Sequence, residues 1–179
     1  MAHTPVLVVR GRRRAWPPTE IIVGDDGSQE SRLAASAAAE IAGAVGAQLR
    51  IVHVIPASWQ DASSPGQARG MAAVAAAAET SLDEVADQVQ QRFGFRPATS
   101  ILIGDAATGL VAEARKTPAP AMLAVGSRGR GSVQRLALGS VSTNVLRAAP
   151  GSVLIYPHPR TAVASVSPVE DTRFVRLAS

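Results

Sequence analysis

The segment GSRGRGSVQRLALGSVS, residues 126–142, follows a short apolar run and leads into a helical pattern. Its first glycines, Gly126, Gly129 and Gly131, let backbone N–H groups turn inward and form a concavity that suits an anion. Gly139-Ser140 then stands just before the next helix, where unpaired N–H groups and the positive dipole end suit a phosphate. Two anion-binding features on one loop favour a polyphosphate over a single carboxylate.

Short apolar runs alternate with helical patterns along the rest of the chain. We expect strands at 20–24, 48–55, 99–104, 121–125 and 152–156, and helices at 28–44, 71–93, 105–115 and 141–148. Residues 57–70, rich in Ser, Gly, Pro and Gln, are expected to form a loop. Nearly all-apolar strands that alternate with helices are typical of a parallel α/β sheet covered on both faces. Such sheets bind ligands beyond the carboxyl ends of the strands, where the strand order reverses.

Length and composition describe one well-buried domain. The 179 residues are 46% hydrophobic and 3% aromatic, so aliphatic side chains must build the core. The absence of cysteine excludes disulfides and thiolate metal sites. No apolar run approaches the roughly 18 residues of a membrane span. The N-terminus is apolar before it is basic, the reverse of a secretory signal. We therefore expect a soluble, cytoplasmic protein that does not enter a membrane.

Two basic features have simple structural interpretations. The run Arg12-Arg13-Arg14 lacks an accompanying aromatic residue or groove-reading helix, so it predicts a solvated linker and no nucleic-acid partner. His53 stands in an apolar strand and is predicted to be a packed residue. His3 and His158 have no metal-ligand spacing with it, so no protein metal site is expected.

The spacing Gly126-x-x-Gly129, nine residues, then Gly139-Ser140 resembles the nucleotide-binding signature of the universal stress protein family. VGDDGS at 23–28 resembles the family's first strand and loop, and HVI at 53–55 the end of its second strand. LGSVSTNVLRAAPGSVLI at 138–155 resembles its last helix and strand. The similarity extends over about residues 19–157.

This resemblance implies an open parallel five-stranded sheet of order 3-2-1-4-5 with helices on both faces. It also implies an ATP site, with or without Mg²⁺, in which adenine lies beside the Val54 backbone and Asp26 lies near the ribose. The segment from Gly126 to Ser140 would surround ribose and phosphates. The predicted nucleotide-binding residues are Asp26, Val54, Gly126, Arg128, Gly129, Gly139, Ser140, Val141 and Ser142.

The sequence departs from the family pattern at three positions. Asp25 stands where the family usually has an apolar residue, and it would weaken phosphate binding if its carboxylate faced the phosphates. Ala121 stands where Asp is frequent, and Ser152 stands where Pro is usual. Neither of these last two positions belongs to the predicted site.

The N-terminal segment HTPVLVVRG, residues 3–11, resembles the fifth strand in PGSVLIYPH, residues 150–158. The linker RRRAWPPTE that follows is similar to the junction between domains of tandem family members, so the chain resembles the second half of such a protein. An unpaired apolar strand invites aggregation. We therefore predict that Pro5–Arg10 pairs antiparallel with Val153–Tyr156, in its own subunit or in a partner, and holds a homodimer together. The predicted division is 1–18 strand and linker, 19–157 nucleotide-binding domain, 158–179 tail.

Three functions remain open at this point. The first is an ATP-binding stress-response protein that acts as a nucleotide-dependent switch or scaffold. The second is a structural dimer of the same fold that binds no nucleotide, and the third is a slow ATPase. No P-loop lysine follows a glycine-rich turn, and Lys116 lies elsewhere, so no catalytic residue is assigned. AMP, ADP or a cyclic nucleotide could replace ATP.

Overall fold

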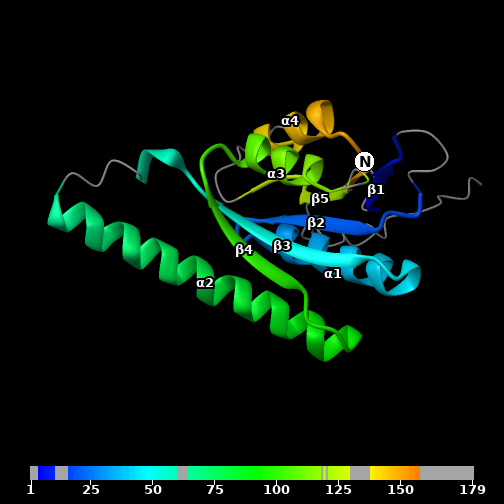
Figure 1. Ribbon diagram of the computed structural model, residues 1–179, viewed down its shortest axis with the longest axis horizontal. Coiled ribbons are helices and arrows are strands. Elements are labelled where there is room, and N and C mark those ends of the chain that lie inside the picture. The colour runs from blue at the N-terminus through cyan, green and yellow to red at the C-terminus, as the bar shows by residue number, and fades with distance from the viewer. Residues whose placement is uncertain are drawn as a thin grey trace, which may run out of the picture.

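The computed structural model describes residues 4–10, 16–59, 64–117, 119, 121–129 and 138–157. Strands and helices alternate along the chain (Figure 1). The strands are β1 (Val6–Val8), β2 (Glu20–Asp25), β3 (Gln48–Ile55), β4 (Ala98–Ile103), β5 (Met122–Gly126) and β6 (Val153–Tyr156). The helices are α1 (Gln29–Val45), the 3-10 helix η2 (Ala57–Trp59), α2 (Pro65–Phe93), α3 (Ala106–Arg115) and α4 (Ser140–Ala148).

The strands form one six-stranded sheet of order β1-β6-β5-β2-β3-β4. Strands β2 to β6 are parallel and have the predicted order, while β1 is an additional antiparallel strand at the edge. The strand order reverses between β2 and β5, which are neighbours in the sheet but far apart in the chain. The carboxyl ends of these two strands therefore flank the crevice where ligands of such folds bind.

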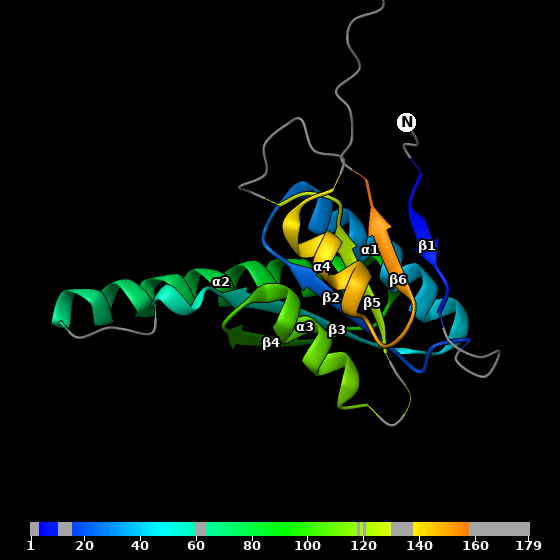
Figure 2. The same cartoon turned by 90° about the horizontal axis from the view of Figure 1, so that it is seen from above.

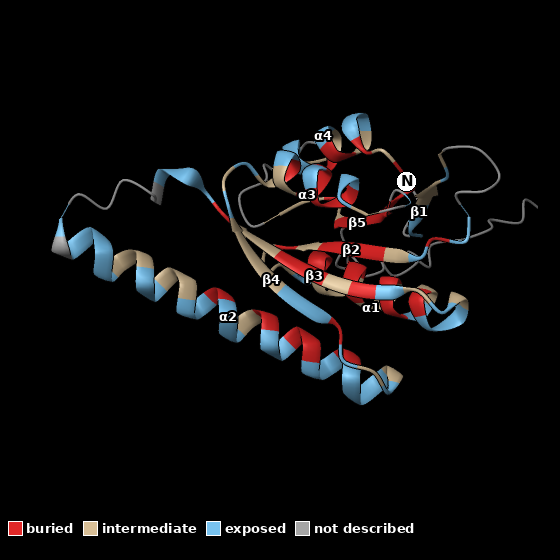
Figure 3. Ribbon diagram, viewed as in Figure 1, coloured by how far each residue is buried: buried red, intermediate tan, exposed pale blue. Residues whose placement is uncertain are grey.

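Helices cover both faces of the sheet and create two cores (Figures 1 and 2). Successive residues of a strand point to opposite faces, so Ile21 and Val23 pack with α1 and α2, and Ile22 packs with α3 and α4. The central strands are buried almost throughout (Figure 3). This double burial explains why their sequences are continuous apolar runs.

Helix α2 begins six residues earlier than the sequence predicts, so the interpretation of 65–70 as loop is wrong. The Ser64 hydroxyl oxygen accepts a hydrogen bond from the Gln67 backbone N–H, and the Gln67 side-chain oxygen accepts one from the Ser64 backbone N–H. These two hydrogen bonds form a capping box. Pro65 occupies the first helical position, where the backbone N–H has no partner within the helix, so the missing N–H of proline costs no hydrogen bond. The first turns of α2 extend past the sheet, and its buried residues begin at Ala78 (Figures 1 and 3).

The predicted pairing of the N-terminal strand is confirmed, within the same chain. Val6 lies opposite Ile155 and Val8 lies opposite Val153 in antiparallel register. The edge of β6 is thereby occupied, and β1 becomes the outer strand (Figure 2). The homodimer stays a prediction, and a partner would meet β1 before β6. The arginine run at 12–14 and the tail at 158–179 lie outside the described residues.

An ion-pair network joins the amino ends of β2 and β3 to α3, at the edge opposite the crevice. The guanidinium of Arg50 donates to Glu20 at 2.7 Å and to Glu113 at 2.8 Å. Lys116 donates to the second carboxylate oxygen of Glu113 at 2.5 Å. The hydrogen bond from Lys116, followed by that from Arg50, holds the pKa of Glu113 below its ordinary value of 4.5 against the effect of its burial.

Candidate functional site

The glycine-rich loop leaves β5 at the centre of the sheet. Gly126 packs directly against the first turn of α1: a Cβ at this position would lie 2.7 Å from Glu30 Cβ and 3.1 Å from the Glu30 carbonyl carbon. Only a residue without a side chain fits there without displacing backbone. The chain then continues into Ser127, whose N–H donates to the Tyr156 carbonyl at the end of β6.

Ser127 joins this loop to the start of α4. Its carbonyl oxygen accepts the Gly139 N–H at 2.7 Å and the Ser142 hydroxyl at 3.1 Å. Gly139 is the N-cap of α4 and offers no side-chain oxygen to the first turn. The first N–H groups of the helix therefore lack a side-chain cap, and the dipole end of α4 points to the crevice beside the loop. This arrangement is chemically suited to a phosphate.

The loop after β2 borders the same crevice. Asp26 Oδ1 accepts the Ser28 N–H at 3.0 Å, and Ser28 in turn caps α1 by accepting the Ser31 N–H. A Cβ built on Gly129 would overlap the Asp26 carboxylate. The two predicted site residues, one from each side of the reversal in strand order, are therefore in close contact.

The carboxylate of Asp25 is buried beside the crevice and is held by neighbouring side chains. Its side chain has no exposed surface, and its Oδ1 accepts the Ser31 hydroxyl at 2.7 Å. Its Oδ2 lies 3.7 Å from Nδ1 of His53, and neither of these two atoms has a hydrogen-bond partner among the described residues. Burial raises the pKa of Asp25, but interactions with His53, Ser31 and the Gly27 N–H outweigh it and hold the pKa below 3.8. Because Asp25 also lines the pocket described next and its lowered pKa keeps it charged, the predicted penalty on phosphate binding stays a prediction.

These segments enclose one pocket of about 660 Å³, within the range of small-molecule sites. All nine predicted nucleotide-binding residues line it. Apolar residues form much of its remaining wall, namely Val52, Pro56, Ala106, Leu110 and Val125, and the rest of the lining is Gly24, Asp25, Ser31 and His53. The pocket thus joins an apolar wall at β3 and α3 to a polar end at the glycine loop and α4.

No cluster of three or more His, Asp or Glu side chains that could hold a metal occurs in the described part of the chain. No described helix is long and apolar enough to cross a membrane.

The family comparison agrees with this geometry. The model of the universal stress protein family matches residues 19–157, which include every strand from β2 to β6 and the whole pocket. The chain belongs to the universal stress protein family.

Curated universal stress proteins of Mycobacterium tuberculosis and Mycobacterium bovis are 32% identical over 160 residues. The match covers 86% of this chain and 52% of each relative, so the chain spans about half the length of the curated relatives it matches.

Solved universal stress proteins share the fold. The structure of UspA from Lactobacillus plantarum has a TM-score of 0.69 and 25% identity, and covers 77% of this chain and 97% of its own. A universal stress protein in complex with cAMP has a TM-score of 0.61 and 28% identity, and covers 76% of this chain and 95% of its own.

The sequence analysis predicted only part of the network formed by Asp25, Ser31 and His53. The prediction that His53 is packed fits a side chain that is 20% exposed, but its neighbour Asp25 was not expected. The register of β2 against β3 places these two residues opposite each other. Knowledge of the strand order, which the resemblance supplied, could have paired them.

Proposed function

We propose that this universal stress protein binds an adenine nucleotide, in the first instance ATP, in the pocket between β2 and β5. It would act through the bound nucleotide as a switch or scaffold in a stress response. One observation carries the proposal: a glycine loop, an uncapped helix N-terminus and an apolar wall meet in a single pocket at the reversal of strand order.

Each part of the pocket suits one part of a nucleotide. The loop at Gly126–Gly129 and the first turn of α4 would receive phosphates through backbone N–H groups and the Ser140 hydroxyl. Arg128 would add a cation on the same side. Asp26 would accept hydrogen bonds from the ribose, and the apolar wall beside Val54 would hold the base.

The residues present fit a nucleotide with or without Mg²⁺. Because the described residues contain no three-carboxylate or histidine cluster, Mg²⁺ would be held mainly by the phosphates themselves, as is usual for this ion. The cAMP complex of the family relative supports an adenine nucleotide as the ligand class. The lining of the pocket includes no lysine, so we expect slow or absent hydrolysis of ATP.

The proposal is tested by identifying what the protein carries. The protein is purified without added nucleotide and denatured, and the released material is analysed by chromatography and mass spectrometry. We expect an adenine nucleotide at up to one molecule per chain. Release of nothing, together with no heat of binding for ATP, ADP, AMP or cAMP by calorimetry, would contradict the proposal.

A homodimer belongs to the same proposal. β1 is the outer strand, and apolar side chains in it and just after it are open to solvent: Val6 is 50% exposed and Val9 is 61% exposed. An open apolar edge of this kind is a site for pairing with another chain. Deletion of residues 1–12, followed by measurement of mass in solution, tests it: an unchanged dimer would refute pairing through this edge.

A further inference from the structure

Helix α4 is anchored at both ends by groups outside it. At its start, the Ser127 carbonyl accepts from Gly139 and Ser142, as described above. At its end, the last carbonyl groups have no partner within the helix and require one from elsewhere. Two arginines supply partners: Arg115 of α3 donates to the Ala148 carbonyl at 3.4 Å, and Arg10 of the N-terminal segment donates to two further carbonyls.

Arg10 makes three contacts beyond β1. Its guanidinium donates through Nη1 to the Ala149 carbonyl at 3.4 Å and through Nη2 to the Leu146 carbonyl. Its backbone N–H donates to the Ser152 hydroxyl at 3.2 Å, at the start of β6. A cation at this end of a helix is also favoured by the helix dipole. Arg10 therefore ties the N-terminal strand, the end of α4 and β6 together.

The position of α4 depends on these contacts at its two ends because the helix is short. It has nine residues, a length at which a helix in isolation is only marginally stable. Within it only Ser142 and Val145 are buried, and Val141 is 37% exposed at the mouth of the pocket. Its apolar contacts are Val145 and the partly buried Leu146, and a helix with so few anchors can tilt as a unit, so a loss of contact at its end is transmitted to its first turn.

We propose that Arg10 is a positioning residue for the phosphate end of the nucleotide pocket and acts through α4. The N-terminal strand then has a second role besides covering the edge of β6: it sets where the first N–H groups of α4 point. This inference rests on the proposed function, because it assumes that phosphates bind at those groups. It adds that phosphate affinity depends on a residue from outside the matched family region, residues 19–157.

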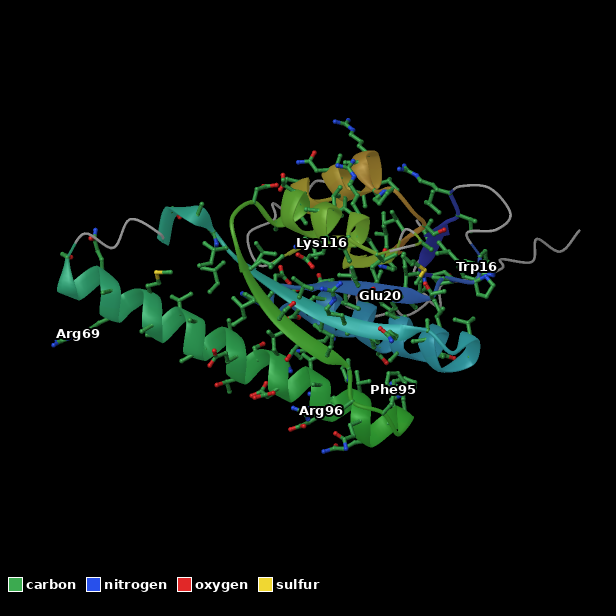
Figure 4. All side chains as sticks on the ribbon, viewed as in Figure 1. Trp16, Glu20, Arg69, Phe95, Arg96 and Lys116 are labelled. Atoms are coloured by element: carbon green, nitrogen blue, oxygen red, sulfur yellow. The ribbon has the colours of Figure 1, made fainter. Side chains whose placement is uncertain are left out.

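The test compares Arg10→Ala with the parent in the full chain, by calorimetry with ATP and with adenosine. We expect ATP affinity to fall about threefold to tenfold, the range of a lost charged cap, and adenosine affinity to change by less than about twofold. Arg10→Lys keeps the cation but has fewer donors, so its ATP affinity should lie between that of the parent and that of Arg10→Ala. Arg69→Ala is the matched control, because Arg69 lies on the projecting start of α2, far from α4 (Figure 4).

Amide hydrogen exchange of α4, measured without nucleotide, provides a second readout. We expect faster exchange near Ala148 and at the first turn in Arg10→Ala and unchanged exchange in Arg69→Ala. If the parent binds ATP and Arg10→Ala binds it equally well, or loses ATP and adenosine affinity alike, the inference is overturned while the proposed function stands. If the parent binds no nucleotide, both are overturned. If Arg10→Ala fails to fold, Arg10→Lys decides between these outcomes.

Discussion

The glycines of the pocket differ in what surrounds them, and this difference separates a ligand role from a structural one. A Cβ at Gly139 would lie 3.5 Å from the Ser127 carbonyl oxygen and 3.6 Å from Arg128 Cα, which are ordinary contacts. Its φ of −73° is open to any residue. Gly139→Ala should therefore fold normally, with a loss of at most about 1 kcal/mol because alanine is a poorer N-cap than glycine. For a chain of this size that is a fall in Tm of about 2–4 °C.

The same substitution should affect binding much more. If phosphate oxygens approach the backbone at the start of α4, a methyl group at Gly139 obstructs them and perturbs the N–H groups around it. We expect ATP affinity to fall about tenfold or more, which is about 1.4 kcal/mol. Gly126→Ala provides the contrast: its methyl group would meet Glu30 backbone, so we expect about 1–3 kcal/mol of lost stability in the protein without nucleotide.

Thermal unfolding and calorimetry with ATP measure the two effects on the same samples. Gly66→Ala is the control, because Gly66 lies in the first turn of α2 and has no atom within 4 Å of a Cβ. It should leave ATP affinity unchanged. The reasoning is refuted if Gly139→Ala binds ATP with the parent's affinity, because phosphates then do not approach this backbone.

Three further predictions concern stability. The depressed pKa of Glu113 stabilises the fold above about pH 4.5, and this contribution is lost as pH falls through the lower folded-state pKa; in urea unfolding between about pH 5 and pH 3, Glu113→Gln should lose less stability than the parent. Asp105→Ala removes the N-cap of α3 and should cost about 1 kcal/mol, read as a lower Tm. Ser31→Ala withdraws the hydroxyl that donates to the buried Asp25 carboxylate and should cost about 1–3 kcal/mol by urea unfolding, whereas a loss below the error of the measurement would contradict that role.

Much of the fold is readable in the sequence because both faces of the sheet are buried. The central strands must then be largely apolar, and local signals set the limits of β3: Gly46 before it, with φ of 71°, and Pro56 after it. The order of the strands came from the family resemblance, since periodicity alone does not say which strands are neighbours. The glycine spacing located one wall of the pocket because a side chain at Gly126 would meet Glu30 and a side chain at Gly129 would meet the Asp26 carboxylate.

The remaining features depend on contacts between distant segments. The capping box at Ser64 and Gln67 is local and was available from the sequence, yet the polar composition around it concealed the start of α2. The burial of Asp25 beside Ser31 requires knowledge of how α1 lies on β2. The contact of Arg10 with the end of α4 joins residues 136 or more positions apart, and no pattern in the sequence indicates it.

The central claim, that an adenine nucleotide occupies the pocket between β2 and β5, is tested most directly by mapping ATP onto the backbone amides by NMR. The account predicts that the largest shifts on adding ATP occur at 126–129 and 139–142, with smaller shifts near Val54. A smaller groove of about 220 Å³ between α1 and α2, lined by Arg32 and Arg92, offers a different location. Shifts concentrated in that groove, or no saturable shifts at all, would contradict the account.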